Sequence, residues 1–196
     1  MIYKLSNLEK SDIYKLTSNL VVPRPIAWVS TISKENILNI APFSYFTPLS
    51  SSPATMLISI GHKPNGKPKD TLKNLRDTKK CSIVIATTSQ LQDMHNSATP
   101  IEHNISEFKE FNIKTTSVNQ NYPDIPKNSK VAFFCEYLQE VDLKGSKTIP
   151  LIVEIKEIFI DDKLLTNKEN LKIDFTNQIA RVGSKYFKLG DEIEVK

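Results

Sequence analysis

Residues 22–71 read VPRPIAWVSTISKENILNIAPFSYFTPLSSSPATMLISIGHKPNGKPKDT, and this stretch decides the fold of the chain. It contains three runs rich in β-branched and aromatic residues, which are typical of strands: Ile26–Ile32, Ile37–Ala41 and Thr55–Ile60. A polar stretch, Ser33–Asn36, separates the first two runs, so we expect them to pair as a β-hairpin. Thr47–Pro53, a stretch rich in serine, threonine and proline, is expected to be a loop, and a second loop is expected at Gly61–Pro68.

Polar residues inside this hairpin are the first candidate site residues, because a core strand normally avoids polar side chains that lack a partner. They are Ser30, Thr31 and Asn39. Pro42 cannot donate a hydrogen bond to a neighbouring strand, so the second strand is predicted to break or bulge there. The break would leave three backbone N–H groups free to face a ligand, those of Ala41, Phe43 and Ser44.

Asp70 or Thr71 is predicted to be the N-cap of a helix, with Lys69 beside its first turn. The free N–H groups and the dipole of a helix N-terminus favour an anion. Residues 63–80 carry seven lysines and arginines against two aspartates. This charge indicates either a solvated helix face or a site for a phosphate-bearing ligand, and it suits a nucleic-acid groove less well because no aromatic residues are interleaved for base stacking.

The rest of the chain predicts one mainly β domain over residues 1–196. The sequence is 39% hydrophobic and 24% charged with a net charge of +4, which is typical of a globular domain. Further strands are expected at Cys81–Thr87, Val131–Leu138 and Ile149–Ile160, and a short helix after the S-x-x-E pattern at Ser6–Glu9. No strand–helix alternation of the parallel type is present, so the sheet is predicted to be antiparallel.

Several classes of site and location are excluded or disfavoured. The apolar runs are far shorter than the roughly 20 residues of a membrane span, and charges interrupt the N-terminus, so we expect a cytoplasmic protein that does not bind membranes. No glycine-rich nucleotide motif, catalytic dyad or metal-ligand spacing occurs. The two cysteines, Cys81 and Cys135, lie in strand-like runs and are predicted to be buried reduced thiols.

Four segments in order resemble the flavin reductase-like, FMN-binding split-barrel family, and most closely its flavoredoxin-type branch. They are Pro23–Thr31 (PRPIAWVST), Asn39–Phe46 (N-x-A-P-F-S-x-F), Ser50–Pro53, and Lys69-Asp70-Thr71 followed by Asn74. Weaker similarity continues through Ser106–Phe108 and Ala180–Gly183. The first hairpin turn departs from the pattern, because Lys34-Glu35-Asn36 stands where many relatives have Asp-Gly.

The resemblance implies a six-stranded antiparallel Greek-key barrel with short peripheral helices, a homodimer, and FMN near the dimer interface. The flavin ring would lie against the backbone of Asn39 and Ala41–Ser44, with Ser30 and Thr31 near the ribityl-phosphate side. Lys69 and Thr71 would hold the phosphate at the helix that Asp70 opens. The implied cofactor-binding set is Ser30, Thr31, Asn39, Ala41, Pro42, Phe43, Ser44, Lys69, Asp70 and Thr71.

The implied reaction is hydride transfer from C4 of a nicotinamide to N5 of the flavin. It requires two positioned rings and no acid–base pair, so no catalytic side chain and no metal are expected. NADH or NADPH would be the donor, and a flavin-dependent monooxygenase or a redox protein could be the acceptor. Two alternatives stay open: a flavoredoxin-like carrier with bound FMN and no direct NAD(P)H oxidation, and, with little support, a nucleic-acid-binding module. The sequence assigns no role to His103 or Arg181.

Overall fold

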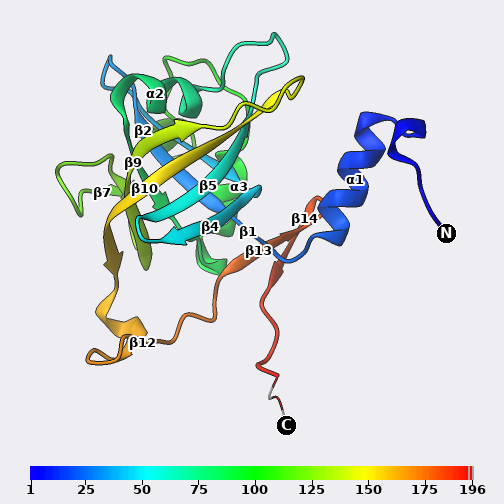
Figure 1. The fold of residues 1–196 in the computed structure, drawn as a ribbon. Helices are drawn as coiled ribbons and strands as arrows, with labels where there is room; N and C mark the ends of the chain where they lie inside the picture. The colour runs from blue at the N-terminus through cyan, green and yellow to red at the C-terminus, as the bar shows by residue number, and fades with distance from the viewer. Residues whose placement is uncertain (194, 196) are drawn as a thin grey trace.

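A single antiparallel sheet forms the body of the computed structural model, which describes residues 1–193 and 195. Its seven strands follow the order β3-β2-β6-β9-β10-β5-β4 (Figure 1). They are β2 (Ala27–Ile32), β3 (Leu38–Phe43), β4 (Phe46–Ser51), β5 (Ala54–Gly61), β6 (Lys80–Val84), β9 (Val131–Glu140) and β10 (Thr148–Ile160). The predicted first hairpin is therefore confirmed as β2 and β3, and the predicted later strands are confirmed as β5, β6, β9 and β10.

Short helices and small sheets surround this sheet. The helices are α1 (Lys10–Leu20), α2 (Asp70–Thr78), α3 (Leu91–Asn96) and α4 (Glu107–Glu110), with 3-10 turns at Leu5–Asn7, Thr88–Gln90 and Asp162–Leu164. The small sheets join β1 (Arg24–Pro25), β13 (Ile179–Val182) and β14 (Lys185–Lys188), then β7 (Thr115–Thr116) with β8 (Ile125–Pro126), and β11 (Leu165–Asn167) with β12 (Lys172–Ile173). Within the described residues, no helix is long and apolar enough to span a bilayer.

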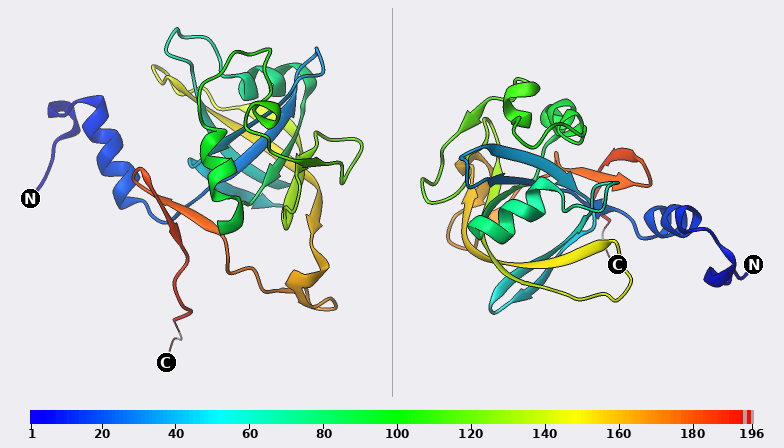
Figure 2. Two further views of the ribbon diagram at one scale, coloured as in Figure 1. Left: turned by 180° about the vertical axis from the view of Figure 1, so that it is seen from behind. Right: turned by 90° about the horizontal axis from the view of Figure 1, so that it is seen from above.

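The two edge strands of the large sheet, β3 and β4, are consecutive in the chain. Only Ser44 and Tyr45 separate them. The Tyr45 carbonyl accepts a hydrogen bond of 2.8 Å from the N–H of Ser59 in β5, so the chain crosses from one edge of the sheet to the other at this corner. The sheet therefore curls toward itself (Figure 2). If β3 and β4 are counted as one bent strand, the sheet has the six strands that the resemblance implied.

The core follows from the alternation of side chains along the strands, because successive residues of a strand point to opposite faces. In β2, Ala27 and Val29 join one apolar cluster, and Trp28 joins the other. The first cluster also contains Leu72 and Leu75, which anchor α2 with no exposed surface. Burying a leucine contributes about 1.5–3 kcal/mol, so α2 is firmly held.

The N-terminal helix is attached differently. It stands away from the sheet in both views of Figure 2, and of its residues, all of which are described, only Ser18 is buried. The guanidinium of Arg24, 5% exposed, donates hydrogen bonds to the carbonyls of Ser18 and Gly183, the latter at 3.1 Å. Arg24 also pairs with Arg181 in the β1–β13 ladder. One buried arginine thus links α1 to the C-terminal hairpin.

Four local predictions were wrong. The second strand does not break at Pro42, which pairs with Trp28 inside β3; a proline is tolerated there because β3 is an edge strand. The predicted loop at Thr47–Pro53 is largely strand β4, whose exposed edge position hides the usual alternation. The N-cap of α2 is Lys69, one residue before the expected position. The N-cap of α1 is Glu9, so Ser6 caps no helix.

Candidate cofactor site

A cavity of about 300 Å3 lies where the end of β3 meets the first turn of α2. Five of the predicted cofactor-binding residues line it: Asn39, Ala41, Lys69, Asp70 and Thr71. Its opposite wall is residues 97–101, which no sequence pattern marked as part of the site. Ser97 is fixed in that wall because its hydroxyl accepts a 2.9 Å hydrogen bond from the indole N–H of Trp28.

Asn39 is the centre of a buried hydrogen-bond network behind this cavity. Its Oδ1 accepts from the hydroxyls of Thr31, at 3.2 Å, and Thr71, at 3.0 Å. Thr31 in turn accepts from the Asn74 amide at 3.1 Å. These side chains come from β2, β3 and α2, so the network joins the hairpin to the helix. It also places Thr31 behind the cavity wall and not on its surface, because Thr31 does not line the cavity.

Glu107, which lies in the weakly similar segment Ser106–Phe108 but was assigned no role from the sequence, completes the network. Both carboxylate oxygens accept from Nδ2 of Asn39, at 2.7 and 2.8 Å, and Oε2 also accepts from the N–H of Ile40 at 3.1 Å. Burial raises the pKa of the Glu107 carboxyl above its ordinary value, while these hydrogen bonds partly oppose the rise. The sequence did not reveal this role of Glu107, because its partners lie 67 and 68 residues away in the chain.

The N-terminus of α2 is open to the cavity. No side chain caps it, so its first N–H groups are available to an anion. The Thr71 hydroxyl has a single hydrogen and donates it to Asn39. In this arrangement a phosphate would receive hydrogen bonds from backbone N–H groups and from Lys69, and not from the Thr71 hydroxyl that the resemblance had implicated. Asp70 also faces the cavity, with both carboxylate oxygens bonded to Lys63 at 2.8 and 2.9 Å.

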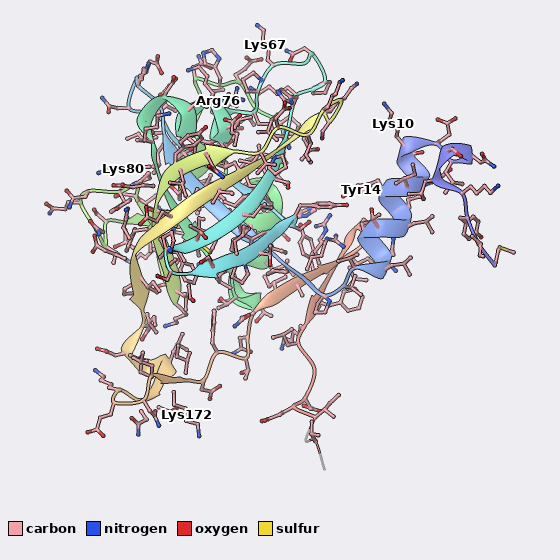
Figure 3. All side chains as sticks on the ribbon, viewed as in Figure 1. Lys10, Tyr14, Lys67, Arg76, Lys80 and Lys172 are labelled. Carbon is pink, nitrogen blue, oxygen red and sulfur yellow. The ribbon has the colours of Figure 1, made fainter. Side chains whose placement is uncertain are left out.

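A second cavity, of about 720 Å3, lies between the barrel and α1. Pro42, Phe43 and Ser44 line it, and α1 contributes the far wall through Lys10, Ile13, Tyr14 and Thr17. The rings of Tyr14 and Tyr45 stack there with centroids 6.2 Å apart. Figure 3 shows Tyr14 and Lys10 extending from α1 at this end of the molecule.

Lys69 lines both cavities and therefore stands at their junction. Its Nζ lies 5.7 Å from the centroid of the Phe43 ring. Within the described part of the chain, Lys69 has no carboxylate partner, in contrast to Lys63 and Lys73. An uncompensated cation beside an uncapped helix start is the feature that a phosphate group would complement.

Ser30 is not part of either cavity. It is completely buried, and its hydroxyl donates a 2.7 Å hydrogen bond to the carbonyl of Asp124. Ser30 follows Val29 and precedes Thr31 in β2, so its side chain points to the face opposite to theirs. Ser30 therefore holds the loop that contains Asp124 against the sheet, and it lies apart from the other predicted cofactor-binding residues.

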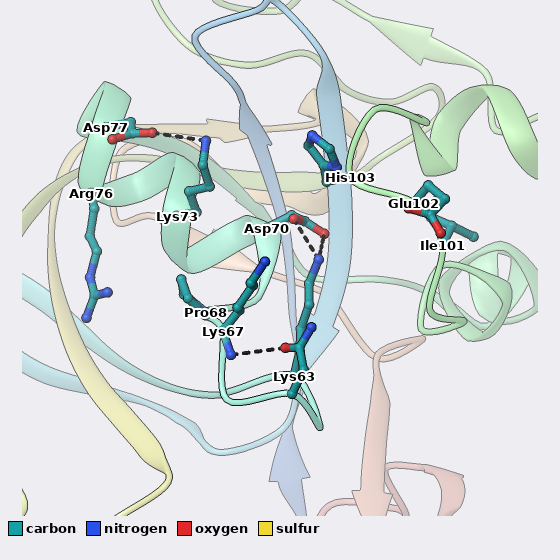
Figure 4. A pocket seen from close by; sticks show the side chains of 11 residues that line it. Lys63, Lys67, Pro68, Asp70, Lys73, Arg76, Asp77, Ile101, Glu102 and His103 are labelled. Atoms are coloured by element: carbon teal, nitrogen blue, oxygen red, sulfur yellow. Dashed lines mark hydrogen bonds and ion pairs between the residues drawn. The ribbon is translucent and has the colours of Figure 1, made fainter.

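The basic run at residues 63–80 forms a third cavity, of about 710 Å3, on the outer side of α2. Figure 4 shows two of its lysines, Lys63 and Lys73, paired with carboxylates. Lys63 pairs with Asp70 and Lys73 with Asp77 at 3.3 Å, while Arg76 forms a pair of 2.8 Å bonds to Glu140 outside the cavity. His103 stands opposite Asp70 across this cavity (Figure 4). Much of the positive charge in the run is thus balanced within the protein.

Comparison with known proteins identifies the class. The family described as flavin reductase like domain matches residues 19–173. An uncharacterized protein of Aquifex aeolicus is 32% identical over 191 residues, covering 95% of this chain and 94% of that protein. Nitrilotriacetate monooxygenase component B from Bacillus cereus superposes with a TM-score of 0.88 at 25% identity, covering 100% of this chain and 98% of that one. Flavoredoxin of Desulfovibrio vulgaris (Miyazaki F) superposes with a TM-score of 0.76 at 13% identity, covering 100% and 97%.

This chain therefore belongs to the flavin reductase-like family. Its fold is the antiparallel split barrel with short peripheral helices that the sequence predicted. The residues present fit a flavin mononucleotide in two respects. Two cavities share Lys69, which has no carboxylate partner among the described residues, and an uncapped helix N-terminus faces the smaller cavity.

Proposed function

We propose that this protein binds FMN and is an NAD(P)H-dependent flavin reductase. The observation that carries the proposal is the position of Lys69 at the junction of the two cavities, beside the open N-terminus of α2. The phosphate would occupy the smaller cavity, against Lys69 and the N–H groups of α2. The ring would then lie in the larger cavity, along Pro42, Phe43 and Ser44. Membership of the flavin reductase-like family supports the cofactor assignment.

The chain's contribution to the reaction is binding and orientation. Bound FMN would supply a two-electron acceptor at its N5, to which C4 of the nicotinamide delivers hydride. Lys69 neutralises phosphate charge, and Phe43 provides an apolar surface at the ring end. The part of the larger cavity between Tyr14 and Tyr45 offers an aromatic wall for a second planar ring. No side chain of this set has to transfer a proton.

An anaerobic titration tests this function. FMN-reconstituted protein is titrated with NADH and then with NADPH while the visible absorbance of the flavin is followed. Bleaching by either donor supports the reductase and identifies the donor. A retained flavin that neither donor bleaches favours an electron carrier, the alternative suggested by the likeness to flavoredoxin. Protein that neither retains FMN nor accelerates NAD(P)H oxidation with added FMN contradicts both.

We also propose that the functional unit is a homodimer. Exposed apolar side chains gather on α1 and just after it: Tyr14 is 54% exposed, Leu20 75% and Val21 67%. Because α1 leaves the barrel with little buried surface, a second copy would cover this face and close the outer side of the larger cavity. Sedimentation equilibrium measures the association. A monomer at micromolar concentration would contradict it.

A further inference from the structure

The side-chain amide of Asn39 makes its hydrogen bonds to other protein side chains. Its oxygen accepts from Thr31 and Thr71, and its nitrogen donates only to Glu107. The side chain of Asn39 is 6% exposed, so it contacts a ligand poorly and instead supports the wall that does. The group that fixes the orientation of this amide is therefore as important to the cavity as the amide itself.

We propose that Glu107 is a positioning residue of the cofactor site, and that its ionised carboxylate sets the geometry of the cavity that binds the FMN phosphate. The proposal rests on the function proposed above. Glu107 itself lines the smaller cavity, and its hydrogen bonds give it control over the position of the other lining residues on β3 and α2.

The hydrogen bonds around Glu107 match the ionised form. Three donated bonds reach its two oxygens, two from Asn39 and one from the Ile40 N–H. A carboxylate accepts all three, whereas a protonated carboxyl must turn one oxygen into a donor, and the facing Asn39 nitrogen cannot accept. Protonation therefore removes at least one bond and presses a hydrogen toward the Asn39 NH2 group.

The position of Glu107 transmits this change to the cavity. The Ile40 N–H lies on the free edge of β3, which α4 covers through the Glu107 carboxylate. On its other side the Asn39 amide holds Thr71, the second residue of α2 and part of the cavity lining. A weakened Glu107–Asn39 contact thus loosens both the strand that leads to Pro42 and the helix start beside Lys69.

Charged groups from three elements surround this carboxylate. Asp70 of α2 raises the pKa of Glu107 further, in addition to the larger effect of burial. Lys63 and Lys69, from the loop before α2, line the same cavity as Glu107. Glu102 and His103 line the adjoining basic cavity. Burial is the largest effect, so the raised pKa brings protonation of Glu107 closer to neutral pH than for an exposed glutamate.

On acidification, the stability of the protein and its affinity for FMN should therefore change in opposite directions. The folded pKa of Glu107 lies above its unfolded value, so the folded state takes up the proton first, and this group adds stability as pH falls from the folded pKa to the unfolded one. FMN affinity, which depends on the ionised form, falls over the same interval. If Glu107 contributed only to folding, FMN affinity and stability would change in the same direction with pH.

The test compares wild type with Glu107→Gln from mildly alkaline pH to pH 4.5. Apo-protein unfolding and the FMN dissociation constant are measured at each pH, and ratios between the two proteins cancel the ionisation of FMN itself. Above the pKa, wild type should bind FMN about tenfold more tightly, the value of one charged hydrogen bond. The ratio should approach one at acid pH, because protonated glutamate resembles glutamine. Over the same interval wild type should gain stability relative to the variant.

Two controls lie on the same short helix. Glu110→Gln removes an exposed carboxylate and should leave the affinity and its pH profile unchanged. Phe108→Leu removes buried apolar surface, so it should lower stability without altering the pH profile of FMN affinity.

Relocating the charge provides a rescue. Asn39→Asp places two carboxylates in contact and should weaken FMN binding at neutral pH at least as much as Glu107→Gln does. In the double variant Asn39→Asp/Glu107→Gln, the new carboxylate on β3 accepts from both threonines and from the new amide nitrogen on α4, while the oxygen of that amide accepts from Ile40. We expect the double variant to recover FMN affinity to within about threefold of wild type, because four of the five hydrogen bonds have a counterpart.

The outcomes separate the two proposals. If wild type binds no FMN at any pH, the proposed function fails. If wild type binds FMN but the ratio to Glu107→Gln does not change with pH, or the double variant binds no better than Asn39→Asp, the role of Glu107 is overturned while the proposed function stands.

Discussion

The two neighbouring cavities have walls of different kinds. A buried hydrogen-bond network supports the smaller cavity, whereas the exposed helix α1 forms one wall of the larger cavity. Asn39, Thr31 and Thr71 are at most 6% exposed, and each makes specified hydrogen bonds to other elements. On α1, by contrast, Tyr14 and Leu20 are more than half exposed, and the end of the helix is held by hydrogen bonds from Arg24 and the Gly183 N–H to the Ser18 carbonyl. The predicted phosphate end is thus built within one chain, whereas the ring end has a wall whose position is weakly determined by that chain.

Removing apolar contacts beneath the first cavity should give the largest effect. Leu72→Ala leaves a void under the first turn of α2, where Leu72 has no exposed surface. We expect a loss of about 2–5 kcal/mol in the free energy of unfolding, measured by urea denaturation. Lys73→Ala, on the exposed side of the same helix, should change it by less than about 0.5 kcal/mol. Equal losses would mean that packing does not fix α2.

Removing the cation at the junction should weaken FMN binding without unfolding the protein. Lys69→Ala loses a charge-assisted hydrogen bond to phosphate, about 1.5–3 kcal/mol or tenfold to a hundredfold in affinity, measured by quenching of FMN fluorescence. Lys67→Ala, an exposed lysine two residues earlier, is the matched control and should lose much less. If both variants lose affinity equally, general charge and not the position of Lys69 attracts the phosphate.

The attachment of α1 can be weakened at Gly183. Its φ is +54°, and a Cβ there would stand 2.4 Å from Oδ1 of Asn19 on α1. Gly183→Ala should cost about 1–2 kcal/mol in thermal unfolding, from backbone strain and displacement of Asn19. Gly145→Ala shares a positive φ of +81° but meets no atom within 4 Å, so it measures the strain alone. Adding Asn19→Ala should recover the difference between the two variants, and no recovery would show that α1 is not displaced.

The smallest effect on folding should come from the exposed face of α1. Leu20→Ser changes a side chain that is 75% exposed, so the free energy of unfolding of the monomer should move by less than about 0.5 kcal/mol. Self-association, measured by sedimentation, should weaken clearly, because this side chain lies on the proposed dimer face. Lys15→Ser on the same helix, 70% exposed, is a polar control. An unchanged association would place the dimer contact elsewhere.

The sequence predicted the strands whose side chains alternate between two buried faces, and it missed β4. A run of apolar, β-branched and aromatic residues is visible at Ala27–Ile32, because both faces of β2 are covered. No such run is visible in Phe46–Ser51, where five of six residues are exposed and serine, threonine and proline imitate a loop. Pro42 was misread for a related reason: a proline signals a break unless its strand lies at an edge, and edge position is a property of the assembled sheet.

The sequence predicted the part of the candidate site whose residues are adjacent in the chain. It did not predict the contacts between residues that are far apart in the chain. The turn from Lys69 to Thr71 is a short segment with a recognisable helix start, and the structure places it at the junction of the cavities. Glu107 acts on Asn39 across 68 positions of sequence, and only the folded chain brings them together. Ser30 and Thr31 are neighbours in sequence, yet the pleat sends their side chains to opposite faces.

The pairing of Arg24 with Arg181 has a consequence for the order in which the chain acquires its structure during synthesis. All seven strands of the large sheet lie before residue 161, so the barrel can assemble on the ribosome while the C-terminal segment is still being made. The first strand, β1, has to wait for β13, its partner, which emerges only after every strand of the large sheet. Helix α1, although it is translated early, is thus among the last elements to be fixed in position. The wall that it gives the larger cavity forms only when the chain is nearly complete.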